Sequence, residues 1–394
     1  MNCDKLSKMK IGIEAQRLFR PHKHGMDIVA LELIRALQLI DSQNEYFIFV
    51  KADEDRSCLS ETSNFHIIEV PSFNYIFWEQ ILLPFYAQKY SIEVLHCTSN
   101  TAPLFISIPL FLTLHDVIFM EKIIGKNTSS NYQKLGNFYR KWLVPKIIQK
   151  CEKIITISEV EKLKIIKTLG INNDTIVVIH NGVSGRFGVK VNNEMITQLR
   201  SQWNLDADFF LFLGNVEPRK NVFNTIRAFV SFAEKNSQVK LVITGLNTTF
   251  VEDILFKIGK KAFLNRFVIT GFVPENVLYT LYAEAKVFLY PSLREGFGLP
   301  ILEAMAFGTP VVTSNISSMP EVAGEAAFLV NPFSVEAITL GMKTAYENES
   351  LRKKKIDSGY LRLKMFTWQK TAEQMINLYV KKSNTIKESN QSLF

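Results

Sequence analysis

Residues 290–310 read Tyr-Pro-Ser-Leu-Arg-Glu-Gly-Phe-Gly-Leu-Pro-Ile-Leu-Glu-Ala-Met-Ala-Phe-Gly-Thr-Pro, and this stretch decides the fold. The apolar run 287–289 before it is typical of a buried parallel strand. Pro300 suits the first position of a helix, because its fixed φ fits there and its missing N–H needs no partner. Ile301–Phe307 is a good helix-forming run, and Gly308 is typical of a helix C-terminus. The stretch therefore predicts a strand, a short loop and a helix in close succession.

Two carboxylates and two glycines give this loop the composition of a ligand-binding site. Glu295 lies in the loop and Glu303 in the helix, while Gly296 and Gly298 would let the backbone approach a ligand at the helix N-terminus. An anionic group at that terminus would place Glu303 beside a pair of sugar hydroxyls, as an acidic residue binds ribose in dinucleotide sites. The alternative is that Glu303 complements the helix dipole and Glu295 is a solvated loop charge.

The pattern of a short apolar run followed by an amphipathic segment recurs along the chain. Residues 28–40, for example, have apolar side chains at helical spacing between two strand-like runs. Strand, helix and strand at this spacing predict doubly wound parallel sheets, whose ligands bind at the carboxyl ends of the strands. The expected strands are residues 10–14, 46–50, 65–69, 93–97, 109–115, 153–157 and 175–179, then 209–213, 240–244, 267–270, 287–289, 310–313 and 327–330.

Bulk properties exclude several classes of protein. A chain of 394 residues is too long for one ordinary core, so we expect two domains. No apolar run reaches the roughly 18 residues that span a bilayer, and the N-terminus lacks the apolar part of a secretory signal, which favours a cytoplasmic protein. The four cysteines include no Cys-x-x-Cys pair, which argues against a structural zinc site and a disulfide framework. A net charge of +8 suits an anionic partner such as a nucleotide, a phospholipid surface or nucleic acid, without choosing among them.

A second motif lies upstream, where residues 214–221 read Gly-Asn-Val-Glu-Pro-Arg-Lys-Asn between an expected strand and an expected helix, 222–233. This order places Arg219 and Lys220 at a helix N-terminus, where backbone N–H groups favour an anion. An arginine can bind two oxygens of a diphosphate at once, while a lysine adds a point charge. The alternative is a turn with two exposed charges.

The run Glu-Gly-Phe-Gly-Leu-Pro followed by Glu303, together with residues 214–221, resembles glycosyltransferase family 4 over nearly the whole chain. The resemblance implies a GT-B fold, with two facing Rossmann-like domains of doubly wound parallel sheets and a cleft between them. We expect an acceptor-side domain at 1–185, a linker at 186–200 and a nucleotide-sugar-binding domain at 201–370. Residues 371–394 would form a helix that crosses back to the first domain, and a tail.

The resemblance also assigns roles to residues. The catalytic residues would be His115, Arg219, Lys220 and Glu295, with His115 and Glu295 at the donor sugar and Glu303 at the ribose. A lone histidine is more often structural, but His115-Asp116 follows an expected strand and matches the family's His-Asp. The donor-binding residues would be Gly25, Gly214, Arg219, Lys220, Phe297, Gly298, Leu299, Pro300 and Glu303, and further candidates at the cleft are Ser158, Asn181 and Gly245. Ser158 and Asn181 could equally be turn residues.

Residues 77–84, Phe-Trp-Glu-Gln-Ile-Leu-Leu-Pro, and 96–100, His-Cys-Thr-Ser-Asn, resemble the mannosyltransferase-B-like subgroup, which builds bacterial surface polysaccharides from GDP-mannose. This implies a retaining transfer of mannose to a hydroxyl of a glycan or lipid-linked acceptor. A UDP-sugar donor, such as UDP-glucose or UDP-N-acetylhexosamine, is the close alternative. Two remote alternatives are an NAD-dependent oxidoreductase, for which the Gly-x-Gly-x-x-Gly motif is missing, and an inactive partner subunit, against which the intact charged residues argue.

We expect neither a metal nor any other cofactor, the nucleotide sugar being a substrate. Many other glycosyltransferases hold a divalent ion with Asp-x-Asp, and this chain has such strings at 53–55 and 206–208. The first lies in a polar loop and the second precedes a strand, away from the ligand edge, so both are expected to be solvated acids. Arg219 and Lys220 would neutralise the leaving diphosphate instead.

A basic and aromatic segment, residues 132–150, predicts a helix that Pro145 interrupts. Such a helix could rest on an anionic membrane, where lipid-linked acceptors are found. A half-buried surface helix with a solvated basic face is the slightly favoured alternative. We therefore expect a cytoplasmic protein, with peripheral contact at the inner face of the membrane as an option and no nucleic-acid partner.

Overall fold

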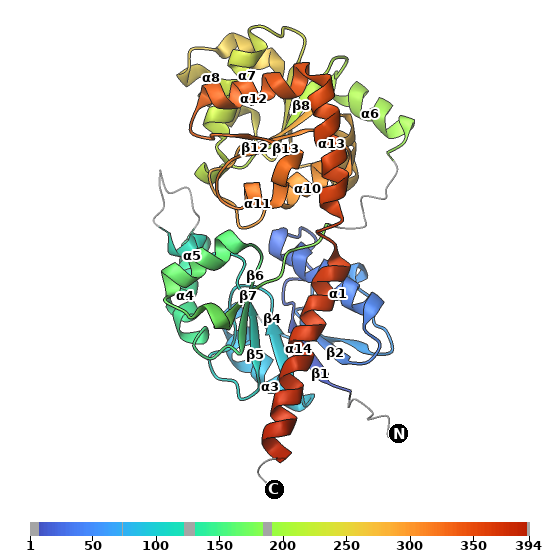
Figure 1. Ribbon diagram of the computed structural model, residues 1–394, viewed down its shortest axis with the longest axis vertical. Coiled ribbons are helices and arrows are strands. Elements are labelled where there is room, and N and C mark those ends of the chain that lie inside the picture. Colours follow the sequence, from blue (N-terminus) through green and yellow to red (C-terminus); the bar gives the residue numbers. More distant parts are fainter. Residues whose placement is uncertain (1–7, 73, 122–130, 184–190, 392–394) are drawn as a thin grey trace. The chain divides into compact units, whose positions relative to one another are not determined.

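A computed structural model describes residues 8–72, 74–121, 131–183 and 191–391 of the chain. The chain divides into two compact units, residues 1–182 with 367–394 and residues 183–366. In each unit, helices flank a parallel sheet (Figure 1). None of the helices described is long and apolar enough to cross a membrane.

The first unit is built on a seven-stranded parallel sheet in the order β3-β2-β1-β4-β5-β6-β7. Its strands are β1 (Lys10–Glu14), β2 (Glu45–Val50), β3 (Phe65–Glu69), β4 (Val94–Cys97), β5 (Leu110–Thr113), β6 (Lys153–Thr156) and β7 (Ile176–Val178). Its helices are α1 (Gly25–Ile40), α2 (Tyr75–Phe77), the π-helix η2 (Trp78–Leu82), α3 (Leu83–Lys89), α4 (Asn131–Ile147), α5 (Glu159–Leu169) and α14 (Trp368–Gln391), with short 3₁₀ turns η1 (Arg56–Cys58), η3 (Ile118–Met120) and η4 (Asn173–Thr175). In register, Ile11 of β1 pairs with Tyr46 of β2 on one side and Val94 of β4 on the other. The strand order therefore reverses between β1 and β4.

The second unit repeats this plan with a six-stranded parallel sheet in the order β10-β9-β8-β11-β12-β13. Its strands are β8 (Phe209–Leu213), β9 (Lys240–Thr244), β10 (Phe267–Gly271), β11 (Val287–Tyr290), β12 (Val311–Ser314) and β13 (Ala327–Val330). Its helices are α6 (Asn193–Trp203), α7 (Val222–Ala233), α8 (Thr248–Lys257), α9 (Glu275–Glu284), α10 (Leu299–Ala306), α11 (Met319–Ala323), α12 (Val335–Glu347) and α13 (Glu349–Leu363), with 3₁₀ turns η6 (Pro218–Lys220), η7 (Lys261–Arg266) and η8 (Gly324–Ala326). In register, Leu211 of β8 pairs with Val242 of β9 and with Phe288 of β11. The strand order reverses here between β8 and β11.

Each sheet has its own apolar core, as expected of strands that are covered on both faces. In the second unit, Phe210 of β8 lies against Phe232 of α7 with ring centroids 4.9 Å apart, and Phe229 contacts the same ring. All three rings are buried. Burying one such side chain contributes about 1.5–3 kcal/mol, so the apolar strand runs found in the sequence also hold the sheets to their helices.

The last helix, α14, belongs to the first unit and packs along α1, as Figure 1 shows. Its Tyr379 is fully buried, and the Tyr379 hydroxyl lies 2.7 Å from Nδ1 of His96. Nε2 of the same histidine lies 2.7 Å from the Thr113 hydroxyl, and burial lowers the pKa of His96 to about 3. His96 is therefore a neutral core residue that joins β4, β5 and α14.

The thirteen expected strands are all present, and the GT-B fold class is confirmed at the level of two doubly wound parallel sheets. Several boundaries differ from those expected. Pro145 lies inside α4 without ending it, and α6 begins at Asn193, within the predicted linker. The final helix begins at Trp368, three residues before the expected segment. Residues 186–190 of the predicted linker lie outside the described residues.

Gly182 is a glycine because of close packing. A Cβ atom at Gly182 would lie 2.2 Å from the backbone nitrogen of Trp368 and 2.6 Å from the carbonyl carbon of Thr367. The Thr371 hydroxyl, one turn into α14, donates to the His180 carbonyl and helps hold this approach. We predict that Gly182→Ala lowers the free energy of unfolding by about 2–3 kcal/mol, because backbone atoms cannot move aside cheaply.

Chemical denaturation of the purified variant would measure this loss. The matched control is Gly136→Ala in α4, where the nearest atom to an added Cβ is 3.8 Å away and alanine should be neutral or stabilising by about 0.5–1 kcal/mol. Equal stability of Gly182→Ala and the wild-type protein would contradict the packing at this position.

Candidate active site

The candidate site lies where the strand order of the second sheet reverses. Ligands of open parallel sheets bind beside the carboxyl ends of the strands at such a point. The segment after β8 carries Arg219 and Lys220, and the segment after β11 carries Glu295. The Leu293 N–H donates to the Arg219 carbonyl over 2.7 Å and joins the two segments. Residues separated by about 75 positions in the chain therefore meet at one edge of the sheet.

The carboxylate of Glu295 is bound by both cations. Nη1 of Arg219 lies 2.7 Å from Oε2, and Nζ of Lys220 lies 2.7 Å from Oε1. Lys220 also donates to the Tyr290 hydroxyl over 3.0 Å, while Arg219 uses its Nε to bind Glu217. The Glu295 and Lys220 side chains are only 8% and 16% exposed. The three side chains form a largely buried ion cluster.

Burial and charge act in opposite directions on this cluster. Burial alone would raise the pKa of Glu295, but the charges of Lys220 and Arg219 outweigh it and hold this pKa below its usual value. Burial lowers the pKa of Lys220, because it outweighs the attraction of Glu295. The pKa of Arg219 is raised, since Glu295 and Glu217 outweigh its burial. An added anion at this site would favour the charged form of Lys220 further.

The backbone of Glu295 is fixed by residues that the sequence did not single out. The Ser317 hydroxyl accepts from the Glu295 N–H over 3.2 Å, and the Ser318 hydroxyl donates to the Glu295 carbonyl over 3.1 Å. Nη1 of Arg294 donates to the same carbonyl over 2.8 Å. Ser317 has a positive φ of 59°, an uncommon conformation for serine. The segment after β12 thus holds the loop after β11 in place.

The glycine-rich loop enters α10 as expected, with one shift in register. Gly298 has a φ of +117° and forms the N-cap, which explains the requirement for glycine. Leu299 is the first helical residue, so Pro300 occupies the second position instead of the first; both early positions leave an N–H unpaired in any case. Phe297 is buried, and its carbonyl accepts from the Ser318 hydroxyl over 2.7 Å.

Glu303 lies on α10 and is partly buried. Its Oε2 accepts a hydrogen bond from the Tyr282 hydroxyl over 3.0 Å. Burial raises the pKa of Glu303 to about 7, more than the hydrogen bond from Tyr282 lowers it. Glu303 therefore changes its charge near neutral pH, whereas Glu295 remains ionised.

Two other candidate glycines, Gly214 of the predicted donor site and Gly245 of the predicted cleft, have packing reasons of their own. A Cβ atom on Gly214 would lie 2.6 Å from Cδ1 of Leu246, and one on Gly245 would lie 2.5 Å from the Gly214 carbonyl oxygen. Gly245 also has a positive φ of 74°. The segments after β8 and β9 lie so close together that both positions require glycine, whether or not a ligand binds there.

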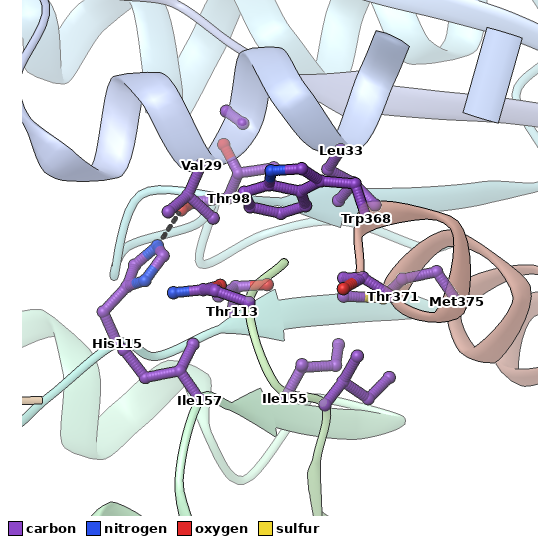
Figure 2. Close-up of a pocket in the computed structure, with 13 residues that line it drawn as sticks. Val29, Leu33, Thr98, Thr113, His115, Ile155, Ile157, Trp368, Thr371 and Met375 are labelled. Carbon is purple, nitrogen blue, oxygen red and sulfur yellow. Dashed lines mark hydrogen bonds between the residues drawn. The ribbon is translucent and has the colours of Figure 1, made fainter. Parts of the chain in front are cut away.

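His115 lies in the first unit, two residues after β5 rather than within the strand. Its backbone N–H donates to the Asn100 side chain over 2.7 Å, and its Nε2 lies 2.9 Å from the Thr98 carbonyl oxygen. A carbonyl can only accept, so Nε2 carries the proton and the neutral ring has its lone pair on Nδ1. Burial lowers the pKa of His115, which favours this neutral form. Figure 2 shows His115 beside a small cavity that Thr98, Thr113 and Trp368 also line.

The remaining candidates of the first unit have different surroundings. Asn181 is buried and lines the same cavity as His115. Ser158 is fully buried, and its hydroxyl caps α5 by accepting from the Glu161 N–H over 3.1 Å. Gly25 is the first residue of α1, its φ is not positive, and nothing lies within 4 Å of an added Cβ atom. The structure gives no steric reason for glycine at that position.

The sequence analysis missed several polar residues at the edge of the first sheet. Glu14, at the end of β1, accepts from the Thr98 N–H over 3.2 Å, and burial raises its pKa to about 7. Nε of Arg17 lies 3.1 Å from Oδ1 of Asp27. An acidic residue at the end of a buried strand was a usable signal for Glu14. No comparable signal marked Tyr282 or Tyr290, which come close to Glu303 and Lys220 only through folding.

The two Asp-x-Asp strings lie elsewhere. Asp55 pairs with Lys23 at 2.5 Å, and Asp208 accepts from the Tyr346 hydroxyl over 3.2 Å. Within the described parts of the chain, no three His, Cys, Asp or Glu side chains lie together in a way that could hold a metal ion.

The ion cluster makes a prediction for stability. Glu295→Gln should lower the free energy of unfolding by about 3 kcal/mol, because it leaves two largely buried cations without their carboxylate. Adding Lys220→Met to this variant should recover part of the loss.

The control pair is Lys260 and Glu234, 2.8 Å apart but about half exposed, where Glu234→Gln should change the free energy of unfolding by less than about 1 kcal/mol. A double-mutant cycle by chemical denaturation that shows no coupling between residues 220 and 295 would contradict the buried cluster.

Comparison with known proteins places this geometry in a family. The family described as Glycosyltransferase Family 4 matches residues 24–184, and the family described as Glycosyl transferases group 1 matches residues 196–362. O-antigen chain mannosyltransferase B from Escherichia coli is 32% identical over 228 residues, which are 57% of this chain and 60% of that protein. The serotype-specific mannosyltransferase WbdA from Escherichia coli is 30% identical over 279 residues, which are 70% of this chain and 34% of that protein. The match thus spans less than two thirds of either relative.

Solved structures support the same assignment at the level of the fold. The glycosyltransferase HepE from Anabaena, solved in complex with UDP-glucose, superposes with a TM-score of 0.72 at 19% identity. That superposition covers 95% of this chain and all of the HepE chain. The two family matches together span most of both units, so the chain combines a Glycosyltransferase Family 4 domain with a Glycosyl transferases group 1 domain, and it is similar to the O-antigen mannosyltransferases.

Proposed function

We propose that this protein is a retaining hexosyltransferase that transfers mannose from GDP-mannose to a hydroxyl of a glycan or lipid-linked acceptor in bacterial surface polysaccharide synthesis. The observation that carries the proposal is the Arg219, Lys220 and Glu295 cluster at the point where the second sheet reverses its strand order. The choice of mannose as the sugar and of a surface polysaccharide as the product rests on the mannosyltransferase relatives.

Transfer begins when the bond between the sugar and the diphosphate breaks, and negative charge then grows on the diphosphate. Arg219 can bind two of its oxygens and Lys220 can add a point charge. Backbone N–H groups of Phe297 to Leu299 at the start of α10 add a positive dipole. Such a preorganised donor group lowers the barrier by roughly 3 kcal/mol. Two cationic side chains in this position would take the part that a metal ion plays in other transferases, so we propose that no metal is required.

Glu295 would have a second role besides the predicted one at the donor sugar. Its carboxylate holds both cations at 2.7 Å, so an arriving diphosphate shares them with Glu295. Arg219 and Lys220 are thereby kept oriented before the donor arrives, and donor binding does not have to order two long side chains. A carboxylate has four lone-pair sites, so Glu295 can still accept a bond from a hydroxyl of the sugar.

Glu303 and His115 complete the proposed set. Glu303 would accept hydrogen bonds from the ribose hydroxyls in its ionised form, with Tyr282 orienting its carboxylate. His115 would accept a hydrogen bond from a sugar hydroxyl at Nδ1, because its Nε2–H is directed at the Thr98 carbonyl. Gly25, Gly214, Gly245, Ser158 and Asn181 remain proposed neighbours of the ligands.

The UDP-sugar alternative rests on a specific observation, the HepE structure with UDP-glucose. That structure shares the fold at 19% identity, whereas the mannosyltransferase relatives reach about 30%, so we favour the mannosyl donor. We also propose a cytoplasmic location with peripheral contact at the inner face of the membrane, where a lipid-linked acceptor would be presented.

A thermal-shift panel of GDP, UDP, ADP and NAD, each with and without magnesium, tests the donor. GDP should raise the melting temperature of the protein most, with no need for magnesium, because a ligand that binds only the folded state stabilises it. Lys220→Ala should lose most of this stabilisation. Larger stabilisation by UDP would indicate a UDP-sugar donor in place of GDP-mannose and would leave the proposed reaction class unchanged. A response to NAD alone would contradict the transferase proposal.

The pKa of Glu303 predicts how donor affinity depends on pH. Below about 7 the carboxyl group is protonated, and above about 7 it is ionised and can accept from both ribose hydroxyls. Affinity for GDP-mannose, whose diphosphate does not titrate in this range, should therefore rise about tenfold as the pH increases through about 7, since bonds to a charged acceptor are roughly 1.4 kcal/mol stronger.

Isothermal titration calorimetry at several pH values would measure this dependence. In Glu303→Gln the affinity should be low and independent of pH, while Glu234→Gln, at an exposed position in the same unit, should behave as the wild type. A Glu303→Gln protein with the affinity and pH profile of the wild type would remove Glu303 from the ribose site.

A further inference from the structure

Exposed apolar side chains gather on one part of the first unit. Along the continuous helix 75–89, Phe77, Ile81 and Phe85 follow one another at four-residue spacing, and each is more than half exposed. On α4, Phe138 is 68% exposed, with Leu135 and Trp142 exposed on the same side of the helix. Phe105, in the segment after β4, is 76% exposed. We call these seven residues the aromatic face; they are Phe77, Ile81, Phe85, Phe105, Leu135, Phe138 and Trp142.

The three segments that carry the aromatic face are joined by one side chain, Gln80. Its Nε2 donates to the Tyr139 hydroxyl over 2.9 Å and to the Ala102 carbonyl over 3.0 Å. Its Oε1 accepts from the Leu104 N–H over 2.8 Å. Gln80 thus links the helix 75–89, the segment after β4 and α4. Buried side chains of both helices, among them Leu83 and Leu143, belong to one apolar core.

Glu79 reinforces this junction from inside. It is 1% exposed, and its carboxylate accepts from the hydroxyls of Tyr75, Tyr139 and Thr101 as well as from Gln80. All the polar atoms that meet at the junction are therefore hydrogen-bonded, and the apolar side chains are left outside.

Basic side chains lie directly on the aromatic face. Nζ of Lys146 is 3.6 Å from the centroid of the Trp142 ring, and Nζ of Lys150 is 4.9 Å from that of Phe105. Residues 74–90, 98–109 and 131–150 contain six basic residues and a single acidic one, the buried Glu79. These segments therefore carry +5 of the +8 net charge of the whole chain.

We infer that the aromatic face is a docking surface for a bilayer that contains anionic phospholipids. Aromatic and aliphatic side chains of this kind enter the boundary between headgroups and acyl chains, and lysines at their edge bind the anionic headgroups. A protein partner would suit the apolar side chains equally well, but the excess positive charge of these three segments favours a surface of uniform negative charge. The inference rests on the membrane contact proposed above and names the surface that would make it, and it holds whether or not the proposed donor is correct.

The test is co-sedimentation of the full chain with vesicles of phosphatidylcholine alone and of phosphatidylcholine mixed with phosphatidylglycerol. The protein should bind the mixed vesicles at least tenfold more tightly than the neutral ones, and added salt should weaken this binding. Two double variants separate the contributions: Phe138→Ser with Trp142→Ser removes apolar contacts, and Lys141→Glu with Lys146→Glu reverses charge. Each should reduce binding at least tenfold.

The matched control is Phe256→Ser with Lys257→Glu, an exposed aromatic and lysine pair on α8 of the second unit, which should bind as the wild type. Melting temperatures and nucleotide-induced shifts should be unchanged in every variant, so that loss of vesicle binding is distinct from loss of the donor site or of folding. Equal binding to both kinds of vesicle, or wild-type binding by the double variants, would overturn the inference. Self-association that disappears in the Phe138 and Trp142 variant would assign the face to a second copy of this chain and would also overturn it.

Discussion

The ion pairs of Glu295 with Arg219 and Lys220 are the interactions on which the candidate site depends. One carboxylate joins the segment after β8 to the segment after β11, and the hydroxyls of Ser317 and Ser318, after β12, fix the backbone of that carboxylate. Three strand ends are thus cross-linked at one edge of the sheet. Because the cluster is largely buried, removal of the carboxylate would leave the two cations poorly solvated and would break one of the links between their loops.

The parallel sheets explain why polar residues from distant parts of the chain meet at all. Every strand of a doubly wound sheet ends at the same edge, so the residue types that follow each strand decide what that edge can bind. In the second unit these residues are cationic and acidic. In the first unit, Glu14 at the end of β1 and His115 after β5 both bind the Thr98 segment after β4, and burial favours the neutral form of both. The two edges therefore differ in charge although the folds are alike.

The segments that carry the aromatic face of the first unit are joined by hydrogen bonds instead of ion pairs. Glu79 and Gln80 are held by hydroxyl and amide groups from three segments, and the hydrogen bonds fix those segments without any contribution from the exposed side chains. Glu79 and Gln80 of the Trp-Glu-Gln sequence, which resembles a subgroup motif, join these three segments in the structure.

The sequence by itself determined the two doubly wound sheets, because apolar runs of strand length alternate with helical periodicity along the chain and a parallel sheet is the arrangement that buries both faces of such strands. It also indicated Arg219, Lys220, Glu295 and Glu303, since each lies next to an expected strand end or helix start. Only the tertiary structure decided that Glu295 holds the two cations, that Glu303 titrates near neutral pH beside Tyr282, and that Gly182 and Gly214 are required by packing. The physical reason is that strand and helix signals depend on neighbours in sequence, whereas ion pairs, burial and close approach depend on residues brought together from distant parts of the chain.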